Sequence, residues 1–141
     1  MLRVKGLNAG YGPLQILTDV DMTANEKEIT VIVGPNGSGK STLLKSIFGL
    51  TTVYSGSIAL DEEELTQLPP HQIARKGIAY LPQVENVFSN LTVKENLSMA
   101  SYTIDKHEAT IRLMEVTEIF PILRDYSRRV AGTMSGGERQ M

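Results

Sequence analysis

The sequence contains no cysteine, which excludes disulfide bonds, thiolate catalysis and thiolate metal sites. It also has no apolar run approaching the roughly 20 residues that a membrane-spanning helix needs. The first residues, Met1 to Lys5, lack the apolar core of a signal peptide. We therefore expect any association with a membrane to depend on a partner protein.

Neither sign of charge predominates. There are 14 lysine and arginine residues against 16 aspartate and glutamate residues, which gives a formal net charge of −2. The basic residues are scattered rather than gathered into a stripe, so we expect no nucleic-acid partner. A chain of 141 residues is the size of one domain with its own core, or of part of a larger domain.

The residues present include an octet of unusual composition. Gly34 to Ser41 reads G-P-N-G-S-G-K-S, which fits the pattern G-x-x-x-x-G-K-[ST] completely. The apolar run Ile29 to Val33 precedes it and predicts a strand buried on both faces. Thr42 to Phe48 follows with helical spacing. This context favours a phosphate-binding loop over an accidental glycine turn in front of a helix.

The loop pattern has a chemical reason. Glycines adopt backbone angles closed to other residues, so successive N–H groups can turn toward one anion, and the helix start adds its own donors and positive dipole end. Lys40 supplies a charge for the β- and γ-phosphates of ATP, and the Ser41 hydroxyl can ligate Mg²⁺. The predicted nucleotide contacts are Gly34, Pro35, Asn36, Gly37, Ser38, Gly39, Lys40, Ser41 and Thr42.

Alternating apolar and polar residues predict several strands. Leu2 to Leu7 and Val20 to Thr23 indicate half-exposed antiparallel strands, joined through the turn-rich segment Asn8 to Pro13. Further along, the pattern predicts strands at Ser55 to Leu60 and Gly77 to Leu81, with an acidic turn at Asp61 to Glu64 and a short helix at His71 to Lys76 between them.

The stretch from about 85 to 130 is predicted to be helical. Thr92 and Glu95 have the spacing of a capping box, and Asp105 is a second candidate cap. The helix after Asp105 is expected to end at Pro121. It is predicted to carry one apolar face formed by Ile111, Met114, Val116, Ile119 and Phe120.

A second motif, Ser135 to Gln140, reads S-G-G-E-R-Q. By itself it fits a helix start, because Ser135 and Glu138 also have capping-box spacing. Beside the phosphate loop it resembles the signature sequence of the ABC ATPases, usually Leu-Ser-Gly-Gly-Gln, with Met134 and Glu138 in place of the leucine and the glutamine. The resemblance implies that Ser135, Gly136, Gly137 and Glu138 act on the γ-phosphate held by another subunit.

Two more positions match this family. Gln83, after Pro82, resembles the glutamine that reaches toward Mg²⁺ and the attacking water, and Tyr11 lies where the family has an aromatic residue stacked on adenine. The implied catalytic residues are Lys40, Gln83, Ser135, Gly136, Gly137 and Glu138, and the implied ligands of Mg²⁺ are Ser41 and Gln83. His71 and His107 have no metal-ligand spacing.

The similarity is greatest to the ATPase subunits of branched-chain amino acid importers. It extends from Leu2 to Met141 and includes S-G-S-I at Ser55, L-P-P-H-Q-I-A-R at Leu68 and L-T-V-K-E-N-L at Leu91. It implies an α/β P-loop NTPase core with an antiparallel β subdomain and a helical insert. The implied partners are transmembrane permease subunits, a second ATPase subunit and, indirectly, an extracytoplasmic solute-binding protein. The implied location is peripheral, at the cytoplasmic face of the cell membrane.

The expected organisation is a single truncated ABC ATPase domain over 1–141. It comprises a β subdomain and P-loop core at about 1–84, a helical subdomain at about 85–130 and the signature at 131–141. Family members continue for about the size of another domain, with a strand ending in the Walker B aspartate, an adjacent glutamate and a switch histidine. We expect this C-terminal part to be missing, and the isolated chain to aggregate through an apolar sheet edge and to lack turnover.

Three alternatives remain open. One is a soluble ABC ATPase acting on DNA or the ribosome, although such proteins usually carry coiled-coil inserts or tandem cassettes, and this sequence has no heptads. Another is an ATP-binding module without turnover. The third is a small-molecule kinase that shares only the phosphate loop, which would leave the signature unexplained.

Overall fold

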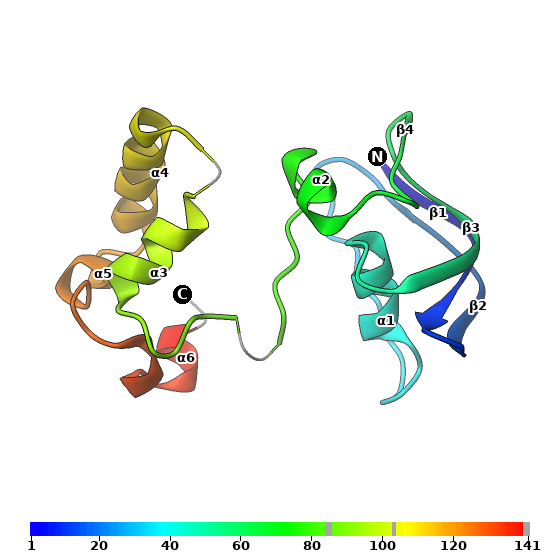
Figure 1. The fold of residues 1–141 in the computed structure, drawn as a ribbon, viewed down its shortest axis with the longest axis horizontal. Coiled ribbons are helices and arrows are strands. Elements are labelled where there is room, and N and C mark those ends of the chain that lie inside the picture. The colour runs from blue at the N-terminus through cyan, green and yellow to red at the C-terminus, as the bar shows by residue number, and fades with distance from the viewer. Residues whose placement is uncertain (84–85, 103, 140–141) are drawn as a thin grey trace. The chain divides into compact units, whose positions relative to one another are not determined.

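A computed structural model of the chain describes residues 1–83, 86–102 and 104–139 (Figure 1). It divides into two compact units, Met1–Tyr80 and Leu81–Met141. The boundary expected between residues 84 and 85 lies outside the described residues. The first unit contains β1 (Leu2–Tyr11), β2 (Leu14–Ala24), α1 (Lys40–Ile47), β3 (Thr52–Leu60), β4 (Glu63–Glu64) and α2 (Pro70–Arg75). The second contains α3 (Val93–Ala100), α4 (Lys106–Ile119), α5 (Ile122–Asp125), the 3₁₀ helix η1 (Ala131–Thr133) and α6 (Gly136–Arg139).

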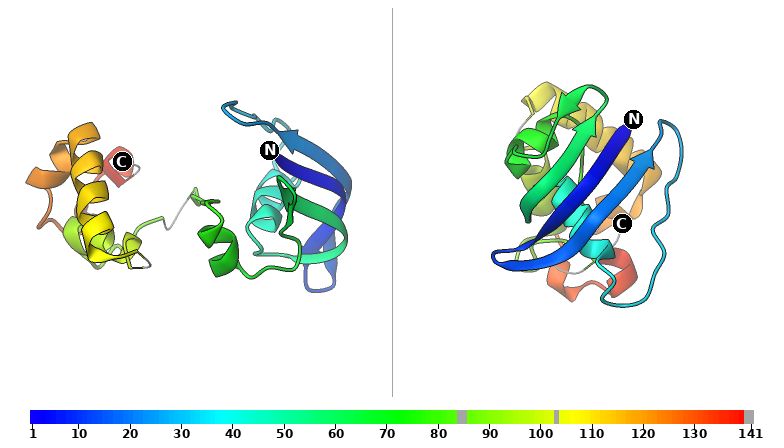
Figure 2. Two further views of the ribbon diagram at one scale, coloured as in Figure 1. Left: turned by 90° about the horizontal axis from the view of Figure 1, so that it is seen from above. Right: turned by 90° about the vertical axis from the view of Figure 1, so that its right-hand side faces the viewer.

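The first unit is an antiparallel sheet with α1 packed on one face. The strand order is β2-β1-β3-β4, and the views in Figure 2 show the three long strands side by side. Both long pairings are antiparallel, with Leu2 opposite Ala24 of β2 and Leu60 of β3. The predicted antiparallel β subdomain is therefore confirmed.

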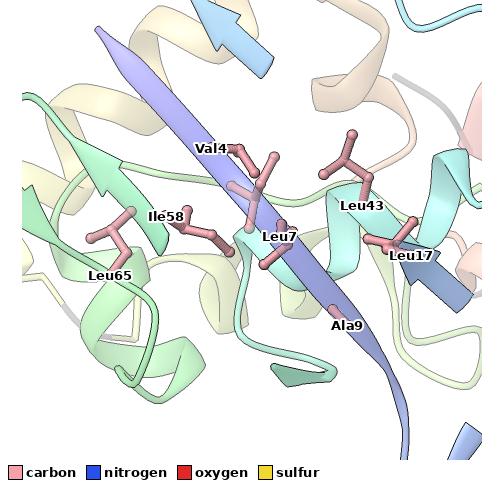
Figure 3. Close-up of a cluster of buried hydrophobic side chains, with 8 residues drawn as sticks. Val4, Leu7, Ala9, Leu17, Leu43, Ile58 and Leu65 are labelled. Atoms are coloured by element: carbon pink, nitrogen blue, oxygen red, sulfur yellow. The ribbon is translucent and has the colours of Figure 1, made fainter. Parts of the chain in front are cut away.

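A buried apolar cluster joins the sheet to α1. It consists of Val4, Leu7, Ala9, Leu17, Leu43, Ile47, Ile58 and Leu65 (Figure 3). Val4 and Leu7 are three residues apart, yet both are buried, because the β1 register shifts between Lys5 and Asn8 around Gly6, whose φ is +52°. Such a bulge changes which residues of a strand face the core.

The β1–β2 hairpin is longer than the alternation of apolar and polar residues in the sequence predicted. Asn8 to Tyr11 were predicted as part of a turn, but they belong to β1, and the turn itself is only Gly12 and Pro13. The prediction was wrong because glycine and asparagine in this segment mark bulges within the strand rather than its end. This correction places Tyr11 at the tip of a sheet rather than in a loop.

The segment Ile29 to Val33 does not form the predicted buried strand. It is irregular, and Ile29, Val31 and Val33 are 94%, 73% and 87% exposed. Only Ile32 packs against the core cluster. A strand exists only where a neighbour pairs with its backbone, and within the described residues this segment has no strand partner.

Two other predictions between β3 and the second unit need correction. Gly77 to Leu81 is irregular, with Ile78 partly buried against the core and Leu81 69% exposed, so the predicted strand is wrong for the same reason. The acidic segment Asp61 to Glu64 turns at its first two residues, and Glu63 and Glu64 form the short β4 opposite Leu60 and Ala59. The short helix is confirmed as α2.

In the second unit, the predicted helix starts are confirmed. Thr92 and Glu95 form a reciprocal capping box on α3, and the Asp105 carboxylate accepts the N–H groups of His107 and Glu108 at the start of α4. Helix α4 ends at Ile119, and Phe120 separates it from Pro121. Around α3 a small core forms from Val93, Leu123, Ala131 and Met134.

The apolar face predicted for α4 is not a buried face. Ile111, Met114 and Ile119 are 44%, 57% and 70% exposed, and among the named residues only Val116 packs against the small core. The prediction was wrong because the apolar positions do not recur at helical spacing closely enough to form one stripe. Thr117 is instead the buried residue of this helix.

Candidate nucleotide-binding site

The phosphate-loop residues lie in the first unit and lead directly into α1. Lys40 is the first residue of that helix, and its Nζ donates hydrogen bonds to the carbonyl oxygens of Gly34 at 2.8 Å and Pro35 at 2.6 Å. The lysine therefore folds back over its own loop. A phosphate oxygen would offer this ammonium a charged acceptor in place of neutral carbonyls, and charge-assisted hydrogen bonds are about twice as strong as neutral ones.

Two glycines give the loop its path. Gly37 and Gly39 have φ values of +81° and +88°, in the region that residues with a Cβ rarely adopt. Gly39 is also the N-cap residue of α1, and a Cβ at this position would lie 2.7 Å from Cδ2 of Leu17 on β2. The sheet thus packs directly against the base of the loop.

The first turn of α1 supplies further donors. Helix geometry leaves its first N–H groups without carbonyl partners in the helix, and no acidic residue in this turn offsets the positive dipole end. The Ser41 side chain is exposed at this end, where its hydroxyl can ligate a cation. The Thr42 side chain is buried, so its backbone N–H is the group left for a ligand.

Tyr11 reaches the same part of the molecule through the β1–β2 hairpin. It is the last residue of β1, 40% exposed, and it pairs with Leu14 across the turn. Ile16 and Leu17 on the returning strand line the space beside Gly39. The tertiary structure therefore packs the hairpin that carries Tyr11 against the phosphate loop, although Tyr11 and Gly34 are more than 20 residues apart in the sequence.

Lys45 is a residue near this site that the sequence motifs did not indicate. Its Nζ lies 5.8 Å from the centroid of the Tyr11 ring, within the distance of a cation–π interaction. The available signal is its position four residues after Ser41, which places both on one face of α1. That spacing alone could not have shown that Tyr11 is nearby.

The signature residues lie in the second unit, at the start of α6. Oγ of Ser135 accepts the N–H of Glu138 at 3.3 Å, while Oε2 of Glu138 accepts the N–H of Ser135 at 2.7 Å. Gly136 and Gly137 form the first turn, and a Cβ on either would meet nothing within 4 Å. Gln140, the last residue of the motif, lies outside the described residues.

The Glu138 carboxylate is stabilised in its ionised form. Hydrogen bonds from the backbone N–H and then the side chain of Ser135 lower the pKa of Glu138 below its usual value, with smaller contributions in the same direction from Tyr126 and Arg129. The Arg129 guanidinium is 3.7 Å from Oε1. The negative charge of the Glu138 carboxylate is therefore directed toward the backbone N–H of Ser135 and toward Arg129.

Gln83 is exposed, in a bend of the second unit, and its side chain makes no hydrogen bond to another described residue. The structure thus places the predicted residues in two groups. Tyr11 and the phosphate loop belong to the first unit, and Gln83 and Ser135 to Glu138 belong to the second. Among the described residues there is no group of three or more histidine, aspartate or glutamate side chains arranged to hold a metal ion.

Comparison with known proteins identifies the family. The family model described as ABC transporter matches residues 17–141, which is well over half of the chain. The chain belongs to the ABC transporter family. The motif resemblance seen in the sequence is thereby confirmed, as is the expected α/β class of ABC ATPase domain.

Relatives of this ABC protein are transport ATP-binding proteins. It is 60% identical over its whole length to a probable branched-chain amino acid transport ATP-binding protein, LivF, of Archaeoglobus fulgidus. It is 44% identical, again over its whole length, to the high-affinity branched-chain amino acid transport ATP-binding protein BraG of Pseudomonas aeruginosa. In both comparisons the chain spans 60% of the relative's length.

Solved structures of the family share its fold. The ATP-binding subunit of an ABC transporter superposes with a TM-score of 0.82 at 30% identity, covering 99% of this chain and 58% of that one. An ATP-binding cassette in its ADP conformation gives 0.77 at 25% identity, over 99% and 61%. In the described part of this chain, no helix is both long and apolar enough to cross a membrane.

Proposed function

We propose that this ABC protein binds ATP and, as part of a transport ATPase subunit, couples ATP hydrolysis to the import of branched-chain or other amino acids. The observation that carries the proposal is the position of Lys40, whose ammonium lies 2.8 and 2.6 Å from carbonyls of its own loop at the positive end of α1. The names of the two relatives support amino acids as the cargo.

The ATP phosphates would bind along the loop from Gly34 to Gly39. Lys40 turns from the loop carbonyls to the β- and γ-phosphates, and the free N–H groups of the first α1 turn bind the oxygens on the other side. Ser41 fits a role as a ligand of Mg²⁺, because its exposed hydroxyl lies at the helix start and this ion prefers few protein oxygens together with phosphates. When bound, Mg²⁺ would neutralise charge on the phosphate oxygens. Tyr11 would stack on the base.

The signature would act on a second molecule's nucleotide. Ser135 would donate its hydroxyl hydrogen, and Gly136 and Gly137 their N–H groups, at a helix start where a Cβ on either glycine would meet nothing within 4 Å. We propose that they contact the γ-phosphate held by a second ATPase subunit, with Gln83 reaching Mg²⁺ and the attacking water. Closure of such a pair would then move transmembrane permease subunits at the cytoplasmic face of the membrane, fed by an extracytoplasmic solute-binding protein.

ATP binding without turnover is a second candidate for the 141-residue chain by itself. Two acidic residues of the first unit, Glu63 and Glu64, are exposed on β4 and make local contacts: Glu63 forms an ion pair with Lys76, and Glu64 accepts a hydrogen bond from Thr66. Binding of Mg·ATP with no release of phosphate would favour this candidate, and turnover by the purified chain would exclude it.

The Lys40→Ala variant tests the phosphate cradle. Removing the ammonium deletes charge-assisted hydrogen bonds of about 1.5–3 kcal/mol each, so the Kd for Mg·ATP should rise by roughly tenfold to more than 100-fold. Isothermal titration calorimetry on the purified chain measures this. Lys94→Ala, which changes an exposed lysine of α3, should leave the Kd unchanged. Equal affinity for the two variants would refute the cradle.

The partner class has its own test. Co-purification of the subunit with membrane permease proteins supports the transport role. Co-purification with ribosomes or DNA would instead support a soluble ABC ATPase. If that complex with ribosomes or DNA dissociated at high salt, the association would be electrostatic.

A further inference from the structure

The hairpin that carries Tyr11 is tied to the neighbouring strand by one side chain. The hydroxyl of Tyr54, on β3, donates a hydrogen bond of 2.6 Å to the carbonyl oxygen of Gly12. Gly12 follows Tyr11 directly in the two-residue turn and has φ +55°. This bond therefore holds the turn at the residue next to the aromatic ring.

A second contact comes from α1. Lys45 places its ammonium 5.8 Å from the Tyr11 ring centroid, and its helix begins at the phosphate loop. Tyr11 is thus held by one residue through the backbone of its turn and by another through its ring. Both contacts lie within the first unit, and both reach a tyrosine that is 40% exposed and would otherwise sample several rotamers.

We propose that Tyr54 and Lys45 are positioning residues that hold the Tyr11 ring in the orientation in which it stacks on the nucleotide base. This inference rests on the proposed function, because it assigns the base contact to Tyr11. Ordering a side chain before the ligand arrives removes part of the entropy cost of binding. The two residues would therefore raise affinity for ATP without touching it.

Two ligands distinguish base binding from phosphate binding. Mg·ATP uses both Tyr11 and the loop, whereas inorganic tripolyphosphate with Mg²⁺ uses only the loop. Tyr54→Phe removes the hydroxyl and keeps the ring, so it should raise the Kd for Mg·ATP by about two- to fivefold and leave the Kd for tripolyphosphate unchanged. Titration calorimetry of both ligands on the full chain measures the ratio of the two Kd values.

The role of Lys45 must be tested with the same ratio of Kd values, because the lysine charge also attracts phosphates from a distance. Lys45→Met should raise the Kd for Mg·ATP about two- to fivefold more than the Kd for tripolyphosphate. Lys45→Arg keeps a cation over the ring and should restore the wild-type ratio. A tighter binding of ATP by Lys45→Met would mean that the lysine blocks the base, which would overturn its positioning role.

A double-mutant cycle decides between positioning and general damage to the fold. In a Tyr11→Ala background the Tyr54→Phe and Lys45→Met changes should no longer alter the ratio, because there is no ring left to position. An effect of the same size in that background would overturn the inference. Tyr102→Phe and Lys94→Met, both at exposed positions of the second unit, are the matched controls and should change neither Kd.

Failure of this inference is distinguishable from failure of the proposed function. If neither ligand binds the wild-type chain, or if Lys40→Ala binds tripolyphosphate normally, the phosphate cradle itself is wrong. If Lys40→Ala loses both ligands while Tyr54→Phe changes neither, the cradle stands and the positioning role is refuted.

Discussion

Ser135 is the residue at which structural and functional roles overlap most closely. Its hydroxyl caps α6 by accepting the Glu138 N–H, and the same hydroxyl is proposed to meet a phosphate of a second subunit. A substitution that merely removed it would change both roles. The two can be separated because asparagine and aspartate both cap helices about as well as serine, while only aspartate adds a negative charge.

We expect Ser135→Asp to abolish ATP-driven pairing of full-length ATPase subunits and Ser135→Asn to retain most of it. Both variants should keep the wild-type Kd for Mg·ATP, because the phosphate loop belongs to the other unit. Analytical ultracentrifugation with and without ATP reports the pairing, and Ser98→Asp on the exposed surface of α3 is the control for charge. Normal pairing of Ser135→Asp would contradict the role in trans.

At the scale of elements, the start of α3 is set by a capping box whose two residues, Thr92 and Glu95, can both be recognised in the sequence. Thr92 and Glu95 exchange hydrogen bonds across the first turn, and the bonds from Thr92 lower the pKa of Glu95. Two backbone contacts fasten the same turn to the chain before η1, from Val93 to Arg129 and from Lys94 to Ser127, each 3.0 Å. The cap therefore fixes where α3 starts relative to the small core of its unit.

Thr92→Ala should lower the free energy of unfolding of the second unit by about 1 kcal/mol, the usual cost of losing a threonine cap. Urea unfolding followed by circular dichroism would show this as an unfolding transition at a lower urea concentration. Thr110→Ala is the control, since this exposed threonine lies inside α4, where alanine is the better helix former and the change should be neutral or slightly stabilising. Equal losses in both variants would show that the cap is not the cause.

At the scale of the whole molecule, the main departure from expectation is the segment before the phosphate loop. Ile29, Val31 and Val33 expose most of their side chains, although their composition is that of a buried strand. An exposed apolar segment with unpaired backbone groups can pair with the same segment of another molecule.

We therefore expect the 141-residue chain to self-associate, and the double variant Val31→Thr, Val33→Thr to do so less. Threonine keeps the β-branched shape and removes apolar surface. Light scattering at increasing protein concentration measures the change, with Tyr102→Ser, an 84% exposed aromatic in the other unit, as the control. A wild-type chain that stays monomeric over the whole range would disprove the expectation.

Local patterns predicted local structure well. The capping box at Thr92, the Asp105 cap, the short helix predicted at His71 to Lys76 and the glycine loop before α1 all depend on residues close together in the sequence, and the structure has these elements at or beside the expected positions. The phosphate-loop and signature residues could be chosen for the same reason, since they belong to short motifs, whereas Tyr11 and Gln83 were implied only by the family resemblance. The predicted strands at Ile29 to Val33 and Gly77 to Leu81 depended on distant partners and were wrong, because within the described residues neither segment has a neighbouring strand.

The sequence by itself determined the phosphate loop, the signature and the family, because glycine angles, caps and a lysine at a helix start are properties of a few adjacent residues. Only the tertiary structure decided that the β1–β2 hairpin packs against Gly39, and that Lys45 and Tyr54 hold the part of it that carries Tyr11. Those contacts join segments far apart in the chain. Their geometry arises from sheet register and helix packing, which no short stretch of sequence encodes.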